Sequence, residues 1–135
     1  MNTFKKEERL CSRRNLDLLF KEGSSFLVYP YRVTFLPTHS ETDHPVKVVF
    51  NVPKRRYKRA VDRNVVKRRM REVYRLNKEN SLYLPLRKSD KQCLLGLQYV
   101  GKEIYPFGLL EKKMLQVFKR LLNDFPGNEV DSKNI

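Results

Sequence analysis

The sequence has few cysteines, few histidines and no long apolar run. Its two cysteines, Cys11 and Cys93, lie 82 positions apart and adjoin no histidine or second cysteine, which fits neither a zinc motif nor a redox pair. We expect both to be reduced thiols, with Cys93 in the core. No apolar stretch approaches the roughly 20 residues of a membrane span, and the N-terminus lacks the apolar centre of a signal peptide. A cytoplasmic protein that contacts no membrane is therefore expected.

Motifs of protein-based catalysis are also missing. The sequence has no glycine-rich phosphate loop, no nucleophile elbow and no zinc-ligand spacing. The two histidines, His39 and His44, lie in a polar stretch with Glu41 and Asp43, which favours a solvated loop over a metal or acid–base site. We predict no catalytic residue and no metal ligand in the chain. A nuclease in which Asp43 or Asp90 holds a metal is an alternative, although no second acid is positioned to share the ion.

Positive charge, in contrast, is abundant and concentrated. The 135 residues carry 29 lysines and arginines against 15 acids, a formal net charge of +14. Residues 54–75 hold eleven of these bases and only two acids, so +9 of the excess lies in 22 residues. Because such an excess repels itself in a compact state, it usually persists where the partner is a polyanion. The local cluster therefore indicates a binding surface for nucleic acid.

The hydrophobic pattern predicts one α+β domain over residues 1–123. Helices are expected at 12–21, 59–76 and from 106 onwards, and strands at 26–38, 46–52 and 92–100. Pro30 marks an edge or a break into two short strands. Residues 77–91 are expected to form a connection with a frayed helix end, and residues 124–135 a disordered polar tail. The order α-β-β-(β)-α-β-α is most simply satisfied by one small, mostly antiparallel sheet with helices packed on it.

Single residues add local detail to this outline. Ser12 is a good N-cap for the first helix, and Gly23 is a stop signal just past its end. Gly96 lies inside the last strand, where a glycine marks a close approach to the backbone. We therefore expect another segment to lie tightly against the last strand at this position.

The helix expected at 59–76 separates apolar from basic residues. Its basic and polar face is formed by Arg63, Asn64, Lys67, Arg68, Arg71 and Arg75. At a rise of 1.5 Å per residue this face extends over about 18 Å. A solvated helix face usually mixes both signs, because like charges four residues apart are destabilising. An arc without an acid therefore favours phosphates as the partner, although Arg69 falls on the apolar side and departs from the pattern.

This helix and its surroundings resemble the protein subunit of bacterial ribonuclease P. The run Arg63-Asn64-Val65-Val66-Lys67-Arg68-Arg69-Met70-Arg71-Glu72, after Ala60-Val61, is similar to the arginine-rich signature of that family. The resemblance covers residues 4–123 and includes Leu10, Asn15, Leu19, Phe20 and Gly23, and the strand at 46–52 followed by Lys54 and Arg55. Three positions depart from the family pattern. Val65 replaces the usual arginine, Lys58 a glycine, and Leu16 a frequent aromatic residue.

The resemblance implies a fold like that of the second domain of ribosomal protein S5 and a role as a subunit of an endoribonuclease. The holoenzyme removes the 5′ leader of precursor tRNA, and its RNA subunit performs the hydrolysis with Mg²⁺ that the RNA mainly holds. The implied partners are ribonuclease P RNA and precursor tRNA, not DNA. The implied contacts with the catalytic RNA are Arg63, Asn64, Lys67, Arg68 and Arg71, with Lys54, Arg55 and Arg56 nearby. The leader is placed between the first helix and the sheet, at Leu16, Phe20, Tyr31, Val33 and Phe35.

Two of these expectations keep alternatives. The leader residues Phe20, Tyr31 and Phe35 have a spacing that fits a stacking platform and also fits a core. A structural RNA-binding protein, such as a small ribosomal protein, would share the size, the charge and the aromatic strands. In either case affinity for RNA should fall steeply with salt. Replacing Arg63 or Arg68 by alanine is expected to weaken RNA binding with little effect on stability.

Overall fold

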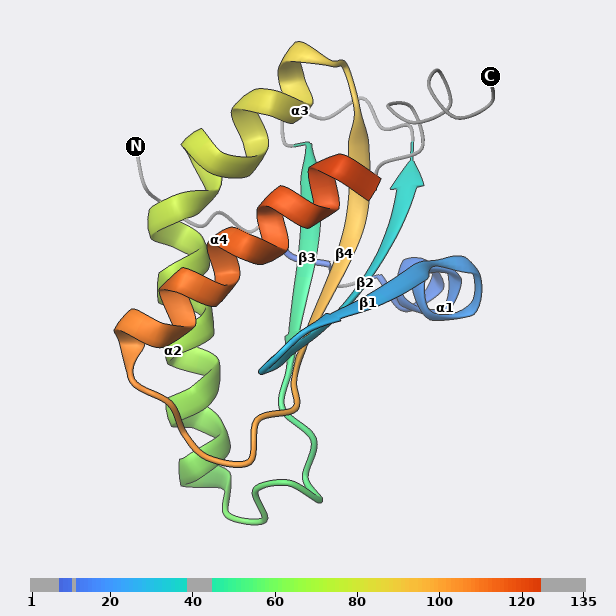
Figure 1. Ribbon diagram of the computed structural model, residues 1–135. Coiled ribbons are helices and arrows are strands. Elements are labelled where there is room, and N and C mark those ends of the chain that lie inside the picture. Colours follow the sequence, from blue (N-terminus) through green and yellow to red (C-terminus); the bar gives the residue numbers. More distant parts are fainter. Residues whose placement is uncertain (1–7, 11, 39–44, 125–135) are drawn as a thin grey trace.

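The computed structural model describes residues 8–10, 12–38 and 45–124, and places helices on both faces of a four-stranded sheet (Figure 1). The elements are α1 (Arg13–Glu22), β1 (Ser24–Val28), β2 (Tyr31–Thr38), β3 (Val46–Asn51), α2 (Ala60–Lys78), the π-helix η2 (Glu79–Tyr83), α3 (Leu84–Lys88), β4 (Gln92–Tyr99) and α4 (Phe107–Asp124). The strand order is β1-β2-β4-β3. Strand β2 is antiparallel to β1 and β4, whereas β3 is parallel to β4. The predicted α+β fold with a mostly antiparallel sheet is confirmed.

Short sequence signals determine where α1 and the first strands begin and end. The Ser12 hydroxyl caps α1 by accepting a hydrogen bond from the Asn15 N–H at 3.3 Å. At Gly23 the N–H still donates to the Leu19 carbonyl at 2.8 Å, but the backbone becomes extended, with φ −75° and ψ 162°, and the helix ends. A Cβ at Gly23 would lie 2.5 Å from that same oxygen, so a larger residue does not fit. Pro30, which follows a cis peptide bond, separates β1 from β2 and confirms the predicted break.

One face of the sheet is covered by α2 and α4 and forms the main core (Figure 1). Tyr31, Val33 and Phe35 point into this core from alternate positions of β2, and all three are buried. The Tyr31 hydroxyl donates to the Leu110 carbonyl of α4 at 3.0 Å, which joins the sheet to the helix. Cys93 is buried in the same core, as predicted, and burial raises the pKa of its thiol to about 12.

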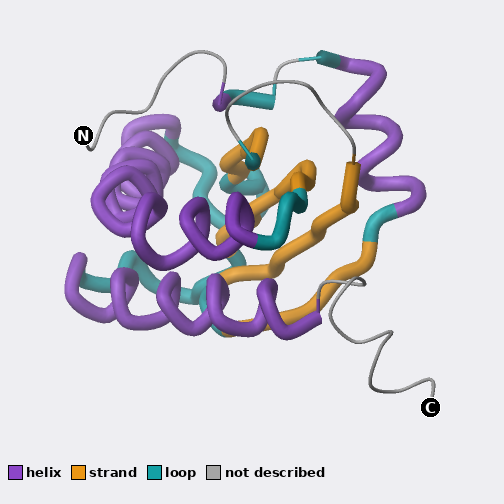
Figure 2. Tube along the Cα trace, turned by 90° about the horizontal axis from the view of Figure 1, so that it is seen from above, coloured by secondary structure: helices purple, strands orange, loops and turns teal. Residues whose placement is uncertain are grey.

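The opposite face of the sheet carries α1, which the strands separate from the other helices (Figure 2). Leu19 of α1 packs there against Leu10 and Leu94 in a small second cluster. Gly96 of β4 lies directly below α1, because a Cβ at this position would be 3.3 Å from carbon atoms of Leu19 and Phe20. The close approach predicted at Gly96 is thus confirmed. Because this cluster is small, α1 leaves part of the sheet face open.

The segment predicted to be a connection, residues 77–91, is instead helical as far as Lys88, so that prediction is wrong. After α2 the chain passes through one π-helical turn, in which the Leu84 N–H donates to the Glu79 carbonyl five residues earlier. Leu82, Tyr83 and Leu86 are buried in the main core from this segment. Tertiary packing therefore overrides the weak helix propensity of the asparagine, serine and proline in this stretch.

A buried ion pair attaches the first described residues to this helical segment. The Glu8 carboxylate accepts hydrogen bonds from the Lys78 ammonium and, at 2.7 Å, from the Tyr83 hydroxyl. Two residues later, the Leu10 N–H donates to the Val48 carbonyl at 2.9 Å, which places the chain beside the edge strand β3. Glu8 and Lys78 are both buried, and an unpaired charge there would be strongly destabilising.

Part of what the sequence predicts lies outside the described residues. Helix α4 ends at Asp124, one residue into the predicted tail, and the remainder of the tail is not described. The same holds for Cys11, His39, Asp43 and His44. Among the described helices, none is long and apolar enough to cross a membrane.

Candidate nucleic-acid interface

Helix α2 presents a row of uncompensated positive charge on its outer side. Asn64, Arg68 and Arg71 are exposed, and Lys67 is half-buried. The Arg71 guanidinium carbon lies 6.0 Å from the centroid of the Phe50 ring, a cation–π contact that holds this side chain over β3. Within the described part of the chain, neither Lys67 nor Arg68 forms an ion pair. Their charges are therefore available to an anionic partner.

Two other arginines of α2 are used inside the fold. Arg63 Nη1 donates to the carbonyl oxygens of Tyr57 and Lys58, at 2.8 Å each, and so holds the loop that precedes the helix. Arg69 Nη1 donates to the Tyr105 carbonyl at 2.8 Å, which explains a base on the apolar side of the helix. Removing Arg63 would leave two carbonyls without this donor. The expectation that Arg63 is dispensable for stability is therefore revised.

The remaining predicted contacts with the catalytic RNA lie in the loop between β3 and α2. Lys54, Arg55 and Arg56 are exposed there, three to five residues after Asn51 ends β3. At the other end of the basic face, Arg75 is neutralised by Glu72, whose Oε2 lies 2.6 Å from Arg75 Nη2. The hydrogen bond from Arg75 lowers the pKa of Glu72. The free charge is therefore greatest in the first half of α2 and in the loop before it.

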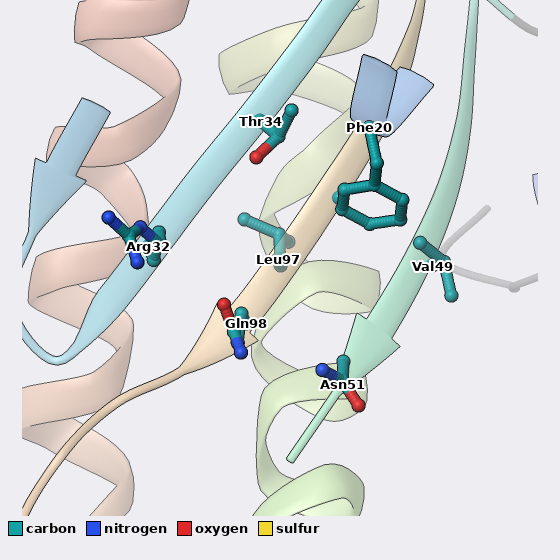
Figure 3. A pocket seen from close by; sticks show the side chains of 8 residues that line it. Phe20, Arg32, Thr34, Val49, Asn51, Leu97 and Gln98 are labelled. Carbon is teal, nitrogen blue, oxygen red and sulfur yellow. The ribbon is translucent and has the colours of Figure 1, made fainter. Parts of the chain in front are cut away.

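A pocket of about 220 Å³ lies on the open face of the sheet, beside α1 (Figure 3). It is lined by Phe20, Arg32, Thr34, Val49, Asn51, Gly96, Leu97 and Gln98. The Phe20 ring is 61% exposed, so it is a side wall of the pocket and not a core residue. The side chains of Arg32, Asn51 and Gln98 make no hydrogen bond to another described residue. Their donors and acceptors are free to bind a ligand beside an aromatic ring.

The structure corrects the predicted leader site. Phe20 lines the pocket, and Leu16 is half-buried against the small cluster below α1. Tyr31, Val33 and Phe35, however, point into the main core on the other face of the sheet. Their placement in a cleft beside α1 is wrong, because alternate residues of β2 share one face of the sheet, and these three lie on the face that α2 and α4 cover. Of the residues for which the spacing left a core role open, Tyr31 and Phe35 are core residues and Phe20 is not.

The polar residues of the pocket are not among those that the sequence predicts, although β2 carries a signal for two of them. Arg32 and Thr34 alternate with the buried residues of β2, so they had to face the side opposite to the core. Asn51 and Gln98 come from strands that are neighbours only in the folded sheet, where they pair in register. No spacing along the chain brings those two residues together.

No group that suits a metal ion was found among the described residues. Three or more His, Cys, Asp or Glu side chains are nowhere close enough in this part of the chain to share an ion. Asp90 is exposed in the turn between α3 and β4, and its φ of 56° is typical of an aspartate in a tight turn. It has no acidic companion there, and Asp43 lies outside the described residues.

Comparisons with known proteins support the family resemblance that the basic helix indicates, and they support the fold. The family model described as Ribonuclease P matches residues 4–100. A ribonuclease P protein component from Porphyromonas gingivalis is 32% identical over 128 residues, which are 95% of this chain and 93% of that protein. Another, from Petrotoga mobilis, is 36% identical over 103 residues, 72% of this chain and 83% of that protein.

A solved structure gives the same result at the level of the fold. The RNase P protein from Thermotoga maritima superposes with a TM-score of 0.67 and 27% identity, over 84% of this chain and 96% of that chain. A structural RNA-binding protein of another class, such as a small ribosomal protein, is not favoured by these relatives. The chain belongs to the ribonuclease P protein family.

Proposed function

We propose that this chain holds the catalytic RNA of ribonuclease P on the outer face of α2 and the 5′ leader of precursor tRNA in the pocket beside α1. As a member of the family, it is the protein subunit of an endoribonuclease with a role in processing the 5′ end of tRNA, and it works with an RNA partner. The observation that carries the proposal is a pair of separate surfaces, one cationic and one aromatic and polar, on opposite faces of one sheet.

The cationic surface fits a folded RNA. Lys67 and Arg68 lie on one turn of α2 and Arg71 on the next, and they follow the loop that carries Lys54, Arg55 and Arg56. Phosphates along an RNA backbone can be bound in bidentate fashion by guanidinium groups, and each neutralised phosphate releases counterions. Asn64 adds an amide to the same face. Arg63, which is bonded to the loop, supports this surface from within and contributes its charge.

The pocket fits a segment of single-stranded RNA. A base can stack on the exposed ring of Phe20, a contact of about 1–3 kcal/mol. The amides of Asn51 and Gln98 offer both donors and acceptors to the edge of such a base. Arg32 then lies within the same pocket for an adjacent phosphate. The leader of precursor tRNA is the single-stranded element of the substrate, so we assign the pocket to it.

The chemistry of cleavage is assigned to the RNA subunit. Mg²⁺ prefers carboxylate and phosphate oxygens in octahedral geometry, and the described side chains form no acidic cluster of that kind. We assign the catalytic step to the RNA, which also holds most of the Mg²⁺. The contribution of the protein is to position the two RNA molecules against each other, which removes much of the entropic cost of their encounter.

Reconstitution tests this proposal. The purified chain should not cleave precursor tRNA in Mg²⁺, whereas it should increase cleavage by a bacterial ribonuclease P RNA. Arg68→Ala should weaken binding to that RNA and reduce the slope of log affinity against log salt by about 0.7–0.9, as expected for one lost phosphate contact. Lys119→Ala is the matched control, since Lys119 is an exposed base on α4 and away from α2's basic face. Cleavage by the chain alone, or equal effects of the two substitutions, would contradict the proposal.

A further inference from the structure

Three loops are joined by hydrogen bonds at one end of the sheet, the lower end in Figure 1. They are the β1–β2 turn, the loop at 52–59 and the loop at 100–106, which we call the end platform. The Val100 N–H donates to the Pro30 carbonyl, and the Tyr57 hydroxyl to the Gly101 carbonyl, each at 2.8 Å. Arg63 and Arg69 of α2 bind two of these loops through backbone carbonyls. The platform is therefore preorganised and continuous with the start of α2.

Tyr29 is the aromatic residue exposed at this platform. Its hydroxyl accepts a hydrogen bond from the Lys102 backbone N–H at 2.8 Å and is hydrogen-bonded to the Tyr105 hydroxyl at 3.1 Å. The two rings meet edge to face, with centroids 6.0 Å apart. The Tyr29 side chain is nevertheless 41% exposed. The hydroxyl thus fixes the orientation of a ring that remains open to solvent.

The platform also carries more cations than acids, since Glu103 is its exposed acid and forms no ion pair among the described residues. The exposed bases are Lys54, Arg55, Arg56, Lys58, Arg59 and Lys102. Among the described residues only Arg59 has a carboxylate within reach, that of Asp62 at 3.9 Å. The hydrogen bonds with Tyr105 and from the Lys102 N–H, and then the charges of Lys102 and Arg56, lower the pKa of Tyr29.

A purely structural role of Tyr29 in joining the loops does not explain both its exposed ring and the unpaired cations around it. Joining loops requires only the tyrosine hydroxyl, which Tyr57 and Tyr31 also use for hydrogen bonds between segments. We propose that the end platform is a further RNA-binding site. An unpaired base of the catalytic RNA stacks on the ring of Tyr29, and the side chains of Arg56 and Lys102 hold the adjoining phosphates. This inference rests on the proposed function, because the partner is the same RNA. Continuity with α2 favours that RNA over the leader, whose pocket is on the other face of the sheet.

Two substitutions at Tyr29 separate the ring from the hydroxyl. Tyr29→Phe and Tyr29→Leu both lose the hydrogen bonds to Lys102 and Tyr105, so both should lower the melting temperature. Only Tyr29→Leu loses the stacking surface. We expect Tyr29→Phe to bind ribonuclease P RNA within about twofold of the wild type, and Tyr29→Leu to bind roughly 5- to 100-fold more weakly. Equal affinity of the two variants would overturn the proposal.

A second experiment keeps the hydrogen bonds of the Tyr29 hydroxyl intact. Lys102→Gln keeps the backbone N–H that binds Tyr29, and should reduce the salt slope of RNA binding by about 0.7. Lys112→Gln, at an exposed position of α4, is the matched control and should leave the slope unchanged. If the two glutamine variants behave alike while Arg68→Ala weakens binding, this inference fails alone. If Arg68→Ala also has no effect, the proposed function fails. A loss confined to precursor tRNA would show that the partner is the leader.

Discussion

The two faces of the sheet use the same strands for different purposes. On the face under α2 and α4, Tyr31, Val33 and Phe35 of β2 are buried and hold the helices in place. On the face beside α1, Arg32 and Thr34 of the same strand line an open pocket. Neighbouring residues thus belong either to the core or to a binding surface, according to the side on which they emerge. Burial, and not aromatic character, therefore separates the residues that stabilise the fold from those that are accessible to a ligand.

The largest expected effect comes from a buried aromatic residue of the covered face. Phe35→Ala should lower the free energy of unfolding by about 3–5 kcal/mol, because it leaves a cavity in the main core. Chemical denaturation followed by circular dichroism measures this loss. Phe20→Ala is the matched change on the open face, where the ring is mostly exposed. Equal losses of stability for the two variants would contradict the distinction between the faces.

A comparable loss should follow from breaking the buried ion pair. Lys78→Met removes the partner of the Glu8 carboxylate and leaves a buried charge, which costs about 3–5 kcal/mol. Adding Glu8→Gln removes that charge while keeping a group that can bind the Tyr83 hydroxyl, so the double variant should recover part of the loss. Denaturant titration of the wild type, the single variant and the double variant measures both changes. A double variant less stable than Lys78→Met would show that the uncompensated charge is not the cause.

Arg63 and Arg68, for which the sequence predicts the same small effect on stability, should differ in how much their replacement lowers the free energy of unfolding. Arg63→Ala should destabilise the protein by about 1–3 kcal/mol, because its guanidinium holds two loop carbonyls. Arg68→Ala should change stability by less than about 0.5 kcal/mol, since Arg68 is exposed and makes no ion pair among the described residues. Thermal melting at matched salt measures the difference. Identical melting temperatures for the two variants would return Arg63 to the purely binding role that the sequence implies.

The smallest effect, a change in the salt dependence of RNA binding, is expected at position 65, one of the three that depart from the family pattern. Val65 is half-buried on α2, where the family resemblance places an arginine. Val65→Arg should add one cation next to the basic face and steepen the salt dependence of RNA binding by up to about 0.7–0.9 in slope. Val65→Lys, which adds a charge without the guanidinium fork, is a useful comparison. An unchanged slope for both variants would mean that position 65 does not meet the RNA.

Much of the fold was accessible from the sequence, because strong local signals coincide with the tertiary structure. The N-cap at Ser12, the break at Pro30 and the apolar periodicity of α4 all predict elements that the structure contains. The helical segment η2–α3 was missed, because Leu82, Tyr83 and Leu86 are stabilised by burial against distant residues and not by propensity.

The candidate site was predictable only in part, for a similar reason. A charge run on one helix is visible in the sequence, so the basic face of α2 was identified. The pocket combines side chains of α1, β2, β3 and β4, and its position depends on which face of the sheet α1 covers. Alternation in β2 divides the residues into two sets, but it does not tell which helices cover each face of the sheet. The structural use of Arg63 likewise depends on a loop whose path the sequence does not specify.

We propose that the open face of the sheet holds the leader, and the double variant Arg32→Ala/Gln98→Ala is the most direct test of this site. Both side chains line the pocket and neither bonds another described residue, so the variant should fold with unchanged stability. In the reconstituted holoenzyme, the ratio of affinities for precursor tRNA with its leader and for mature tRNA should fall roughly tenfold, while binding of mature tRNA stays the same. An unchanged ratio in a fully folded variant would contradict the account.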